Sequence, residues 1–199
     1  MNTSFAKPET LLGTALAPLD WTRSVGLAFA FSLLTALAAQ IVIPIGPVPI
    51  TGQSFAVLLT GALLGSRLGA AAMTIYLVEG ASGLPFFYAG NGGLQHLLGP
   101  TGGYLVAFPA AAFVTGAFAE QGWDKRYITA VAAMATGSLV IMLGGWAWLT
   151  QFMPPVVAFH QGVSKFIIGD IVKILLAAAV LPTGWALLKR KASNSRQET

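Results

Sequence analysis

The chain has 199 residues, of which 55% are hydrophobic and 9% are charged, and its formal net charge is +4. An ordinary soluble domain carries roughly 25% charged residues, so these side chains are too few to cover a surface that faces water. Composition therefore excludes an ordinary soluble domain and indicates an integral membrane protein. The chain contains no cysteine, which excludes disulfides and thiolate metal sites.

Apolar blocks separated by short loops follow one another along the chain. Four blocks reach or approach the roughly 20 residues that cross a bilayer, namely Ser24–Ile43, Gly103–Ala119, Tyr127–Leu149 and Ile167–Leu188. The region Ile50–Leu84 is harder to interpret, because Ser66 and Arg67 divide it into two pieces near the lower limit of roughly 17 residues. Arg67 lies either in a loop between two helices or inside one helix.

The positions of Lys and Arg decide between these alternatives, because cytoplasmic loops keep basic residues and short translocated loops lack them. With two helices in the region, basic loops alternate with loops 44–53, 89–102 and 150–163, which have neither Lys nor Arg. A single helix would break this alternation and place Arg67 in the membrane, at a cost of about 2.5 kcal/mol or more. We therefore predict an all-α integral membrane bundle of six transmembrane helices with both termini cytoplasmic.

This topology divides the chain into three parts of a single transmembrane domain. Residues 1–23, which include Lys7 and Arg23, form a cytoplasmic N-terminal segment; residues 24–188 form the bundle; residues 189–199 form a basic cytoplasmic tail. The residues before position 20 lack the basic start and compact apolar core of a cleaved signal peptide, so we expect none. Topology also explains the positive net charge, which therefore does not indicate nucleic-acid binding.

Asp170 and Lys173 interrupt the last apolar block. Three residues apart, they lie on one face of a helix, a single turn from each other. Each charge near the membrane centre costs about 2.5–3.5 kcal/mol, so we expect both to face the bundle interior, to pair, or to line a wet cavity. A binding site or charge pathway is the default interpretation of such groups. The alternative is an internal ion pair that ties the sixth helix to its neighbours.

Four segments carry a family resemblance, and they are Val48–Gly65, Gly83–Phe87, Leu98–Leu105 and Gly169–Lys173. The Gly-Pro-Thr-Gly-Gly-Tyr and Gly-Asp-x-x-Lys motifs within them are the most specific. Together they resemble the BioY family, the biotin-binding S components of energy-coupling-factor (ECF) vitamin transporters, from about Ser24 to Leu188. The resemblance implies a six-helix membrane protein that captures biotin from the outer side. It also implies that Asp170 and Lys173 belong to the vitamin pocket.

Biotin presents a ureido ring with two N–H donors and one carbonyl, an apolar bicycle and chain, and a carboxylate. An aspartate accepts hydrogen bonds from N–H groups, while an ammonium donates to a carbonyl or carboxylate. We expect other polar side chains to complete the binding set beside Asp170 and Lys173, and these are Asn91, Gln53, Gln95 and Tyr88. The aromatic candidates for the apolar wall are Phe86, Phe87, Tyr88 and Trp146.

The chain contains no Gly-x-x-x-x-Gly-Lys-Ser/Thr phosphate loop, so it cannot hydrolyse ATP by that route. The resemblance implies a transmembrane coupling subunit and a pair of ABC-type ATPases. Along the first helix, small residues recur every four positions at Ser24, Ala28, Ser32 and Ala36, where another helix could approach closely. The resemblance implies that the coupling subunit docks on such a stripe, so we expect these four residues on an outer face. The alternative is an internal seam.

Two other functions remain open at this point. A self-sufficient carrier or channel is compatible with the same residues. Gly80-Ala-Ser-Gly83 matches the Gly-x-Ser-Gly around the nucleophile of rhomboid proteases, but that serine needs a base, and His96 and His160 lie in loops. Two distant histidines without companion ligands do not form a metal-site pattern either. We expect no enzyme activity, no cofactor and no metal.

Overall fold

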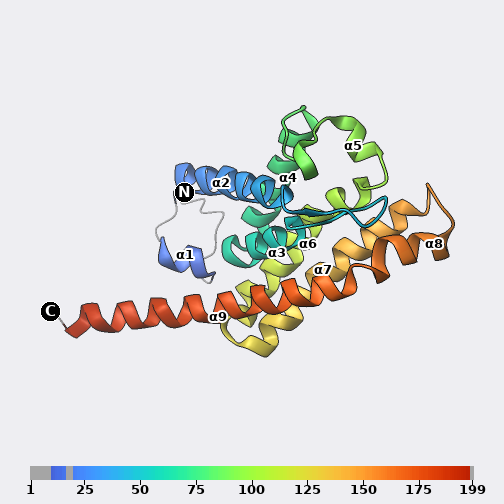
Figure 1. Ribbon diagram of the computed structural model, residues 1–199. Helices are drawn as coiled ribbons and strands as arrows, with labels where there is room; N and C mark the ends of the chain where they lie inside the picture. Colours follow the sequence, from blue (N-terminus) through green and yellow to red (C-terminus); the bar gives the residue numbers. More distant parts are fainter. Residues whose placement is uncertain (1–9, 17–19, 198–199) are drawn as a thin grey trace.

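A computed structural model describes residues 10–16 and 20–197 (Figure 1). Lys7, with the rest of the predicted N-terminal segment before residue 10, lies outside the described residues. The elements before residue 100 are, in chain order, α1 (Leu11–Ala15), α2 (Trp21–Ala39), β1 (Val42–Ile43), β2 (Ile50–Thr51), α3 (Gln53–Leu64), α4 (Ser66–Ala81), η1 (Tyr88–Gly90) and α5 (Leu94–Leu98). The elements that follow are α6 (Gly102–Glu120), η2 (Trp123–Lys125), α7 (Tyr127–Leu149), α8 (Pro155–Phe159), η3 (His160–Ser164) and α9 (Ile167–Gln197).

The predicted helices agree with the structure except at two ends. The first was expected to reach Ile43, but α2 ends at Ala39, because the next residues extend into β1 and pair antiparallel with β2. The fold is therefore not strictly all-α, although each of the two strands is only two residues long. The last helix was expected to end at Leu188, but α9 continues to Gln197 through most of the predicted tail. Figure 1 shows the C-terminal part of α9 projecting beyond the bundle.

The chain breaks between α3 and α4 at Gly65, which confirms two helices in this region instead of one. Gly65 has φ +89°, a left-handed conformation that favours glycine. The Glu120 carboxylate at the end of α6 accepts hydrogen bonds from the Ser66 backbone N–H at 2.9 Å and from the Ser66 hydroxyl at 2.8 Å. A carboxylate is favoured at a helix N-terminus, where N–H groups lack partners. Arg67 is exposed in the first turn of α4.

Four helical stretches in the described part of the chain are long and apolar enough to cross a membrane, and they are Trp21–Ala39, Gly102–Glu120, Tyr127–Leu149 and Pro155–Arg190. The other two predicted crossings are shorter, because α3 has 12 residues and α4 has 16. At 1.5 Å per residue they measure about 18 and 24 Å, less than the roughly 30 Å of a hydrocarbon core. The number of crossings therefore stays a prediction.

The centre of the bundle is α6, which packs against α3, α4 and α7. Its buried face includes Tyr104, Phe108, Ala111 and Ala112. The long α9 lies along α7 and also contacts α3 (Figure 1). A cavity bounded by α3, α6, α7 and α9 can therefore be lined by residues that are far apart in the sequence.

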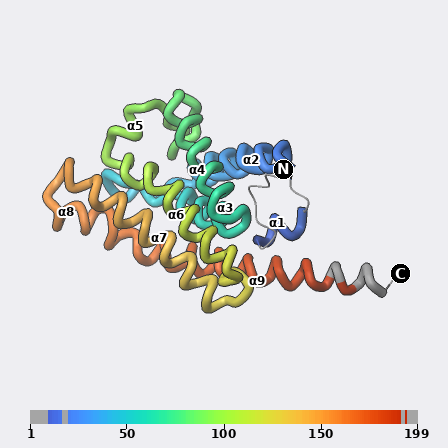
Figure 2. Tube along the Cα trace, turned by 180° about the vertical axis from the view of Figure 1, so that it is seen from behind, coloured from blue at the N-terminus to red at the C-terminus, as the bar shows by residue number. Residues whose placement is uncertain are grey.

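The loops without Lys or Arg lie at the same end of the bundle. There α5 and α8 lie away from the projecting end of α9 in both views (Figures 1 and 2). The Trp148 indole N–H donates to the carbonyl oxygen of Gly99 at 3.0 Å, and the Tyr104 hydroxyl donates to the carbonyl oxygen of Gly162 at 2.8 Å. These bonds fasten loop 89–102 to α7 and loop 150–163 to α6.

The loop between α6 and α7 lies at the opposite end of these two helices. Its η2 turn holds Asp124, which is 1% exposed, and the Trp185 indole N–H on α9 donates to Asp124 Oδ2 at 2.6 Å. The ammonium of Lys125 lies 4.7 Å from the centre of the Trp185 ring. This contact fastens the late part of α9 to the α6–α7 loop, just before the helix leaves the bundle.

Candidate functional site

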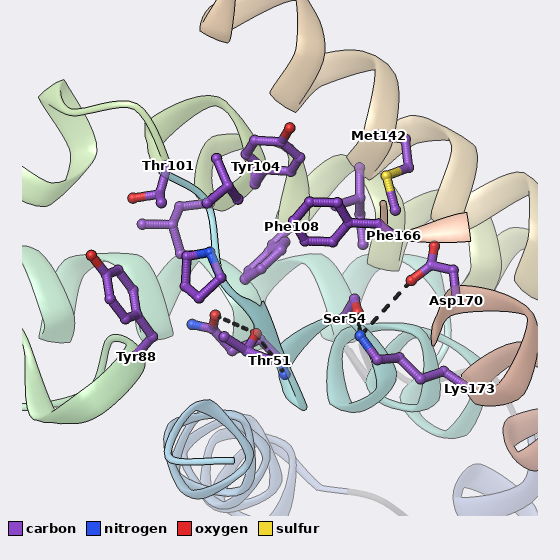
Figure 3. A pocket seen from close by; sticks show the side chains of 15 residues that line it. Thr51, Ser54, Tyr88, Thr101, Tyr104, Phe108, Met142, Phe166, Asp170 and Lys173 are labelled. Carbon is purple, nitrogen blue, oxygen red and sulfur yellow. Dashed lines mark hydrogen bonds and ion pairs between the residues drawn. The ribbon is translucent and has the colours of Figure 1, made fainter. Parts of the chain in front are cut away.

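A cavity of about 520 Å³, including the space at its mouth, lies among α3, α6, α7, α9 and the β1–β2 hairpin (Figure 3). The residues that line it are Val48, Pro49, Thr51, Gln53, Ser54, Tyr88, Thr101, Tyr104, Leu105, Phe108, Ile141, Met142, Phe166, Asp170 and Lys173. Most are apolar or aromatic. The two charged residues lie at one end, Tyr88 and Thr101 lie at the other, and Thr51 lies between them (Figure 3).

One end of the cavity carries the two charges of α9. Asp170 Oδ1 and Lys173 Nζ lie 3.9 Å apart, which is longer than a direct hydrogen bond. Each charged group is hydrogen-bonded to a serine from another helix: Lys173 donates to Ser54 Oγ on α3 at 2.9 Å, and Ser138 Oγ on α7 donates to Asp170 Oδ2. Asp170 is 8% exposed, so this is a nearly buried charged corner that three helices build together.

Aromatic rings form the middle of the cavity. Tyr104 and Phe108 lie one turn apart on α6, and Phe166 precedes α9. The Tyr104 and Phe166 rings stack with centroids 6.3 Å apart and planes inclined by 26°. Because the Tyr104 hydroxyl donates to the carbonyl oxygen of Gly162, its ring has a fixed orientation. Figure 3 shows the three rings between the charged corner and Tyr88.

The far end of the cavity carries neutral polar groups, with Tyr88 and Thr101 on the side away from Asp170 (Figure 3). The nearby Gln53 amide is fixed by a chain of hydrogen bonds. The Thr51 hydroxyl donates to Gln53 Oε1 at 2.9 Å, and Gln53 Nε2 donates to the Tyr76 hydroxyl. Tyr76 is fully buried and donates in turn to the carbonyl oxygen of Phe86 at 3.0 Å.

The structure brings four of the six predicted ligand-binding residues together, and these are Asp170, Lys173, Gln53 and Tyr88. Asn91 and Gln95 lie outside the lining and bind within their own loop. The Asn91 amide donates to the carbonyl oxygen of Tyr88 at 2.8 Å, and the Gln95 amide donates to that of Gly92 at 3.0 Å. The side chains of Asn91 and Gln95 are thus bonded within their loop and do not line the cavity.

The predicted aromatic wall is mostly replaced by other rings. Phe87 is fully buried in the core, and the Trp146 indole N–H donates to the carbonyl oxygen of Pro155 at 3.2 Å. Neither they nor Phe86 line the cavity, whereas Tyr88 does. The sequence analysis did not identify the rings of Tyr104, Phe108 and Phe166 as lining residues. Their spacing could have indicated this role, because Tyr104 and Phe108 are four residues apart, as are Phe166 and Asp170, and residues at this spacing share one face of a helix.

The small-residue stripe of α2 does not lie on an outer face, so that prediction is wrong. Its four residues are nearly inaccessible, with Ser24 1%, Ala28 3%, Ser32 0% and Ala36 4% exposed. They are small because α4 packs closely against α2 here, and the Ser32 hydroxyl donates to Glu79 Oε2 on α4. Ser24 and Ala28 also line an apolar groove between the two helices, together with Trp21, Val25, Arg67, Leu68, Ala71 and Ile75. The stripe is an internal seam.

Comparison with known proteins assigns the chain to a family. A family model described as the BioY family matches residues 6–190. The probable biotin transporter BioY of Pyrococcus horikoshii is 45% identical over 79% of this chain and 93% of its own length. The biotin transporter BioY of Thermotoga maritima is 37% identical over 75% of this chain and 88% of its own.

A solved structure is similar in fold as well. It is described as the S-component for biotin from an ECF-type ABC transporter, and it matches 81% of this chain and 90% of its own with a TM-score of 0.71 and 25% sequence identity. The family match, the identity to the named transporters and the shared fold agree with one another. The chain belongs to the BioY family.

Proposed function

We propose that this chain binds biotin in the cavity that contains Asp170 and Lys173, and that it is the substrate-specificity component of an ECF-type transporter. The relatives are named as biotin transporters, and the solved structure with the same fold is described as a biotin S-component. The observation that carries the proposal is the cavity itself. It combines a charged corner, an aromatic middle and a neutral polar end, and biotin needs all three.

The ureido ring of biotin fits the charged corner. Asp170 accepts a hydrogen bond from a ureido N–H, and Lys173 donates to the ureido carbonyl. These two groups are adjacent in the ligand, as the carboxylate and ammonium are in the cavity, where 3.9 Å separates them. The bicycle then lies against Tyr104, Phe108 and Phe166. The valeryl chain points to the end with Tyr88 and Thr101, whose hydroxyls donate to the ligand carboxylate.

ATP-driven transport requires partners, because the sequence contains no phosphate-binding loop. We propose a transmembrane coupling subunit and ABC-type ATPases as these partners, in the cell membrane. The solved structure of similar fold is described as part of an ECF-type ABC transporter. The internal position of the α2 stripe means that a docking surface must be formed by other residues of the bundle.

The proposed topology has six crossings with both termini cytoplasmic. Loops without Lys or Arg hold α5 and α8 at one end, whereas η2 and the basic part of α9 lie toward the other (Figure 1). The short helices α3 and α4 complete their crossings with adjoining non-helical backbone. Irregular backbone in a membrane has to be shielded from lipid by protein. Val48 and Phe87 are 4% and 0% exposed, whereas residues 82–85, directly after α4, are exposed.

A self-sufficient biotin carrier uses the same cavity, and uptake into cells that lack coupling subunits distinguishes it. The protease hypothesis is not retained, because the named relatives are transporters. In addition, the Ser82 hydroxyl donates to the carbonyl oxygen of Glu79 at 2.7 Å and so serves to end α4.

Calorimetric titration of the detergent-purified protein tests the proposal. Biotin is compared with thiamine, riboflavin and the biotin precursor desthiobiotin, which keeps the ureido ring but lacks the sulfur. We expect saturable one-site binding of biotin, weaker binding of desthiobiotin and none of the other vitamins. Absence of biotin binding by a monodisperse, thermally stable preparation contradicts the proposal.

A further inference from the structure

The charges in the cavity are close enough to attract each other but are not in direct contact. Among the residues that the structure describes, Ser54 is the acceptor for Lys173, and Ser138 is the donor to Asp170. The second carboxylate oxygen, Asp170 Oδ1, faces the ammonium at 3.9 Å. A direct Lys–carboxylate hydrogen bond measures roughly 2.7–2.9 Å. This is an ion pair held open, with an unused acceptor on one side and unused donors on the other.

The open arrangement of Asp170 and Lys173 competes with a closed one, in which the two charges are in direct contact. Coulomb attraction strengthens as the charges approach, and it is least screened in a buried site, so an unconstrained Asp170 and Lys173 would close into a contact pair. The side chains lie on the same face of α9, one turn apart, and the long Lys173 side chain can reach the carboxylate. Hydrogen bonds to hydroxyls on two other helices oppose this closure, because each bond anchors one charge, and bringing the charges together would stretch or bend both bonds.

We propose that Ser138 and Ser54 are positioning residues, which keep Asp170 and Lys173 apart and so leave both charges ready to bind a ligand with adjacent donor and acceptor groups. This inference rests on the proposed function, since it concerns the same cavity. Neither serine needs to touch the ligand to have this effect. Ser138 is 4% exposed and does not line the cavity, so it acts through Asp170.

The functional consequence is preorganisation. A ureido ring that enters the open pair gains two charge-assisted hydrogen bonds without breaking a contact ion pair. If the pair were closed, the ligand would first have to separate the charges, and its apparent affinity would fall by the fraction of molecules in the open arrangement. The serines therefore set affinity through the geometry of the two α9 residues and not through added contact area.

The test measures biotin affinity by calorimetry for Ser138→Ala and Ser54→Ala, with Thr136→Ala as the matched control. Thr136 is on the same helix as Ser138, and its hydroxyl donates to the carbonyl oxygen of Ala132, away from the cavity. We expect Ser138→Ala to weaken biotin about tenfold, Ser54→Ala several-fold, and Thr136→Ala not at all. Ser138→Thr, which restores the hydroxyl, should recover most of the loss.

A double-mutant cycle separates positioning from general packing. If Ser138 acts through Asp170, adding Ser138→Ala to Asp170→Asn should cost little further affinity. If Ser138 merely packs the helices, the loss should be the same in both backgrounds, and threonine should not rescue it; that result overturns the inference. Wild-type protein that binds no biotin overturns the proposed function. Wild-type binding with unchanged Ser138→Ala and Ser54→Ala affinities overturns only the positioning role.

Discussion

Asp170 and Lys173 lie one turn apart on α9, yet each is hydrogen-bonded to a serine of another helix and not to the other. An ion pair whose only role was to fasten helices would be expected to close. The open arrangement lies at one end of a cavity lined by aromatic rings (Figure 3). It therefore favours a ligand-binding role for these charges over a purely structural one.

The first prediction concerns these charges. Asp170→Asn and Lys173→Met should each weaken biotin binding at least tenfold, because a hydrogen bond to a charged group is worth about 1.5–3 kcal/mol. Calorimetric titration of the purified variants measures the effect. Lys165→Met is the control, since the Lys165 ammonium donates to Gln161 Oε1 at 2.6 Å in an exposed segment that does not line the cavity.

The double variant Asp170→Asn/Lys173→Met distinguishes a ligand-binding role of these residues from a purely structural ion pair. If the two residues form only an internal ion pair, each single change leaves an unpaired buried charge, and replacing both should restore stability. Binding would then also recover in the double variant. Recovery of biotin affinity in the double variant would therefore contradict a direct role in the ligand site.

The second prediction concerns the buried network below Gln53. Tyr76→Phe removes a hydroxyl that accepts from Gln53 and donates to the carbonyl oxygen of Phe86. Leaving these buried partners unsatisfied should cost about 1–3 kcal/mol of stability, and biotin affinity should fall because the Gln53 amide loses its orientation. Thermal unfolding in detergent and calorimetry measure the two effects. Tyr127→Phe, at a 48% exposed tyrosine, is the control, and an effect equal to that of Tyr127→Phe would refute the network.

The third prediction follows from the corrected position of the α2 stripe. Ala28→Trp should disrupt the packing of α2 against α4 and lower the melting temperature or prevent purification, because so large a side chain at a 3% exposed position forces the two helices apart. Phe29→Trp is the matched control at the next position, where the side chain is 50% exposed. A stable Ala28→Trp protein with normal biotin affinity that fails only to associate with a coupling subunit would restore the docking hypothesis.

Charge and apolar length were sufficient to predict most of the fold. The boundaries of α7 match the predicted block, and the break near Arg67 was predicted because a mid-membrane arginine is costly. The end of α2 was predicted incorrectly, because Ile41–Ile43 is as apolar as the helical residues before it. Its extended conformation depends on the pairing of Val42–Ile43 with Ile50–Thr51, which the local sequence does not reveal.

The site was also predictable only in part, because some of its contacts join residues that are far apart in the sequence. Asp170 and Lys173 stand out because charges in a membrane need an explanation, whereas Ser54 and Ser138 are neutral and far from them in sequence. The α2 stripe shows the converse limit. Small residues every four positions permit close helix approach, but the pattern is the same for a neighbour in this chain and for a partner.

The fourth prediction concerns pH and Asp124. Burial raises the pKa of the Asp124 carboxyl, while the hydrogen bond from Trp185 and the charge of Lys125 act in the opposite direction. Asp124 Oδ1 is buried and has no hydrogen-bond partner within residues 10–16 and 20–197, so the protonated form is favoured in the folded protein. A raised folded-state pKa contributes stability that is present below the unfolded pKa of about 3.9 and is lost as pH rises through the folded pKa.

The variant Asp124→Asn, which cannot ionise, should lack this component of the pH dependence. Relative to the variant, wild type should therefore become less stable as pH rises from about 4. Melting temperatures of both proteins in the same detergent across this range measure the difference. Parallel curves for the two proteins would show that Asp124 keeps its ordinary pKa in the folded state.

The fifth prediction concerns topology, and the absence of cysteine from the sequence makes it directly testable. Single cysteines at Gln95 and His160, both exposed in loops without Lys or Arg, should react with an impermeant maleimide in intact cells. Cysteines at Arg67 and Gln121, exposed at the opposite helix ends, should react only after the membrane is opened. The unmodified chain is the control and should not react. Labelling of Arg67→Cys from outside would show that α3 and α4 do not both cross, and complete reversal would invert the proposed orientation.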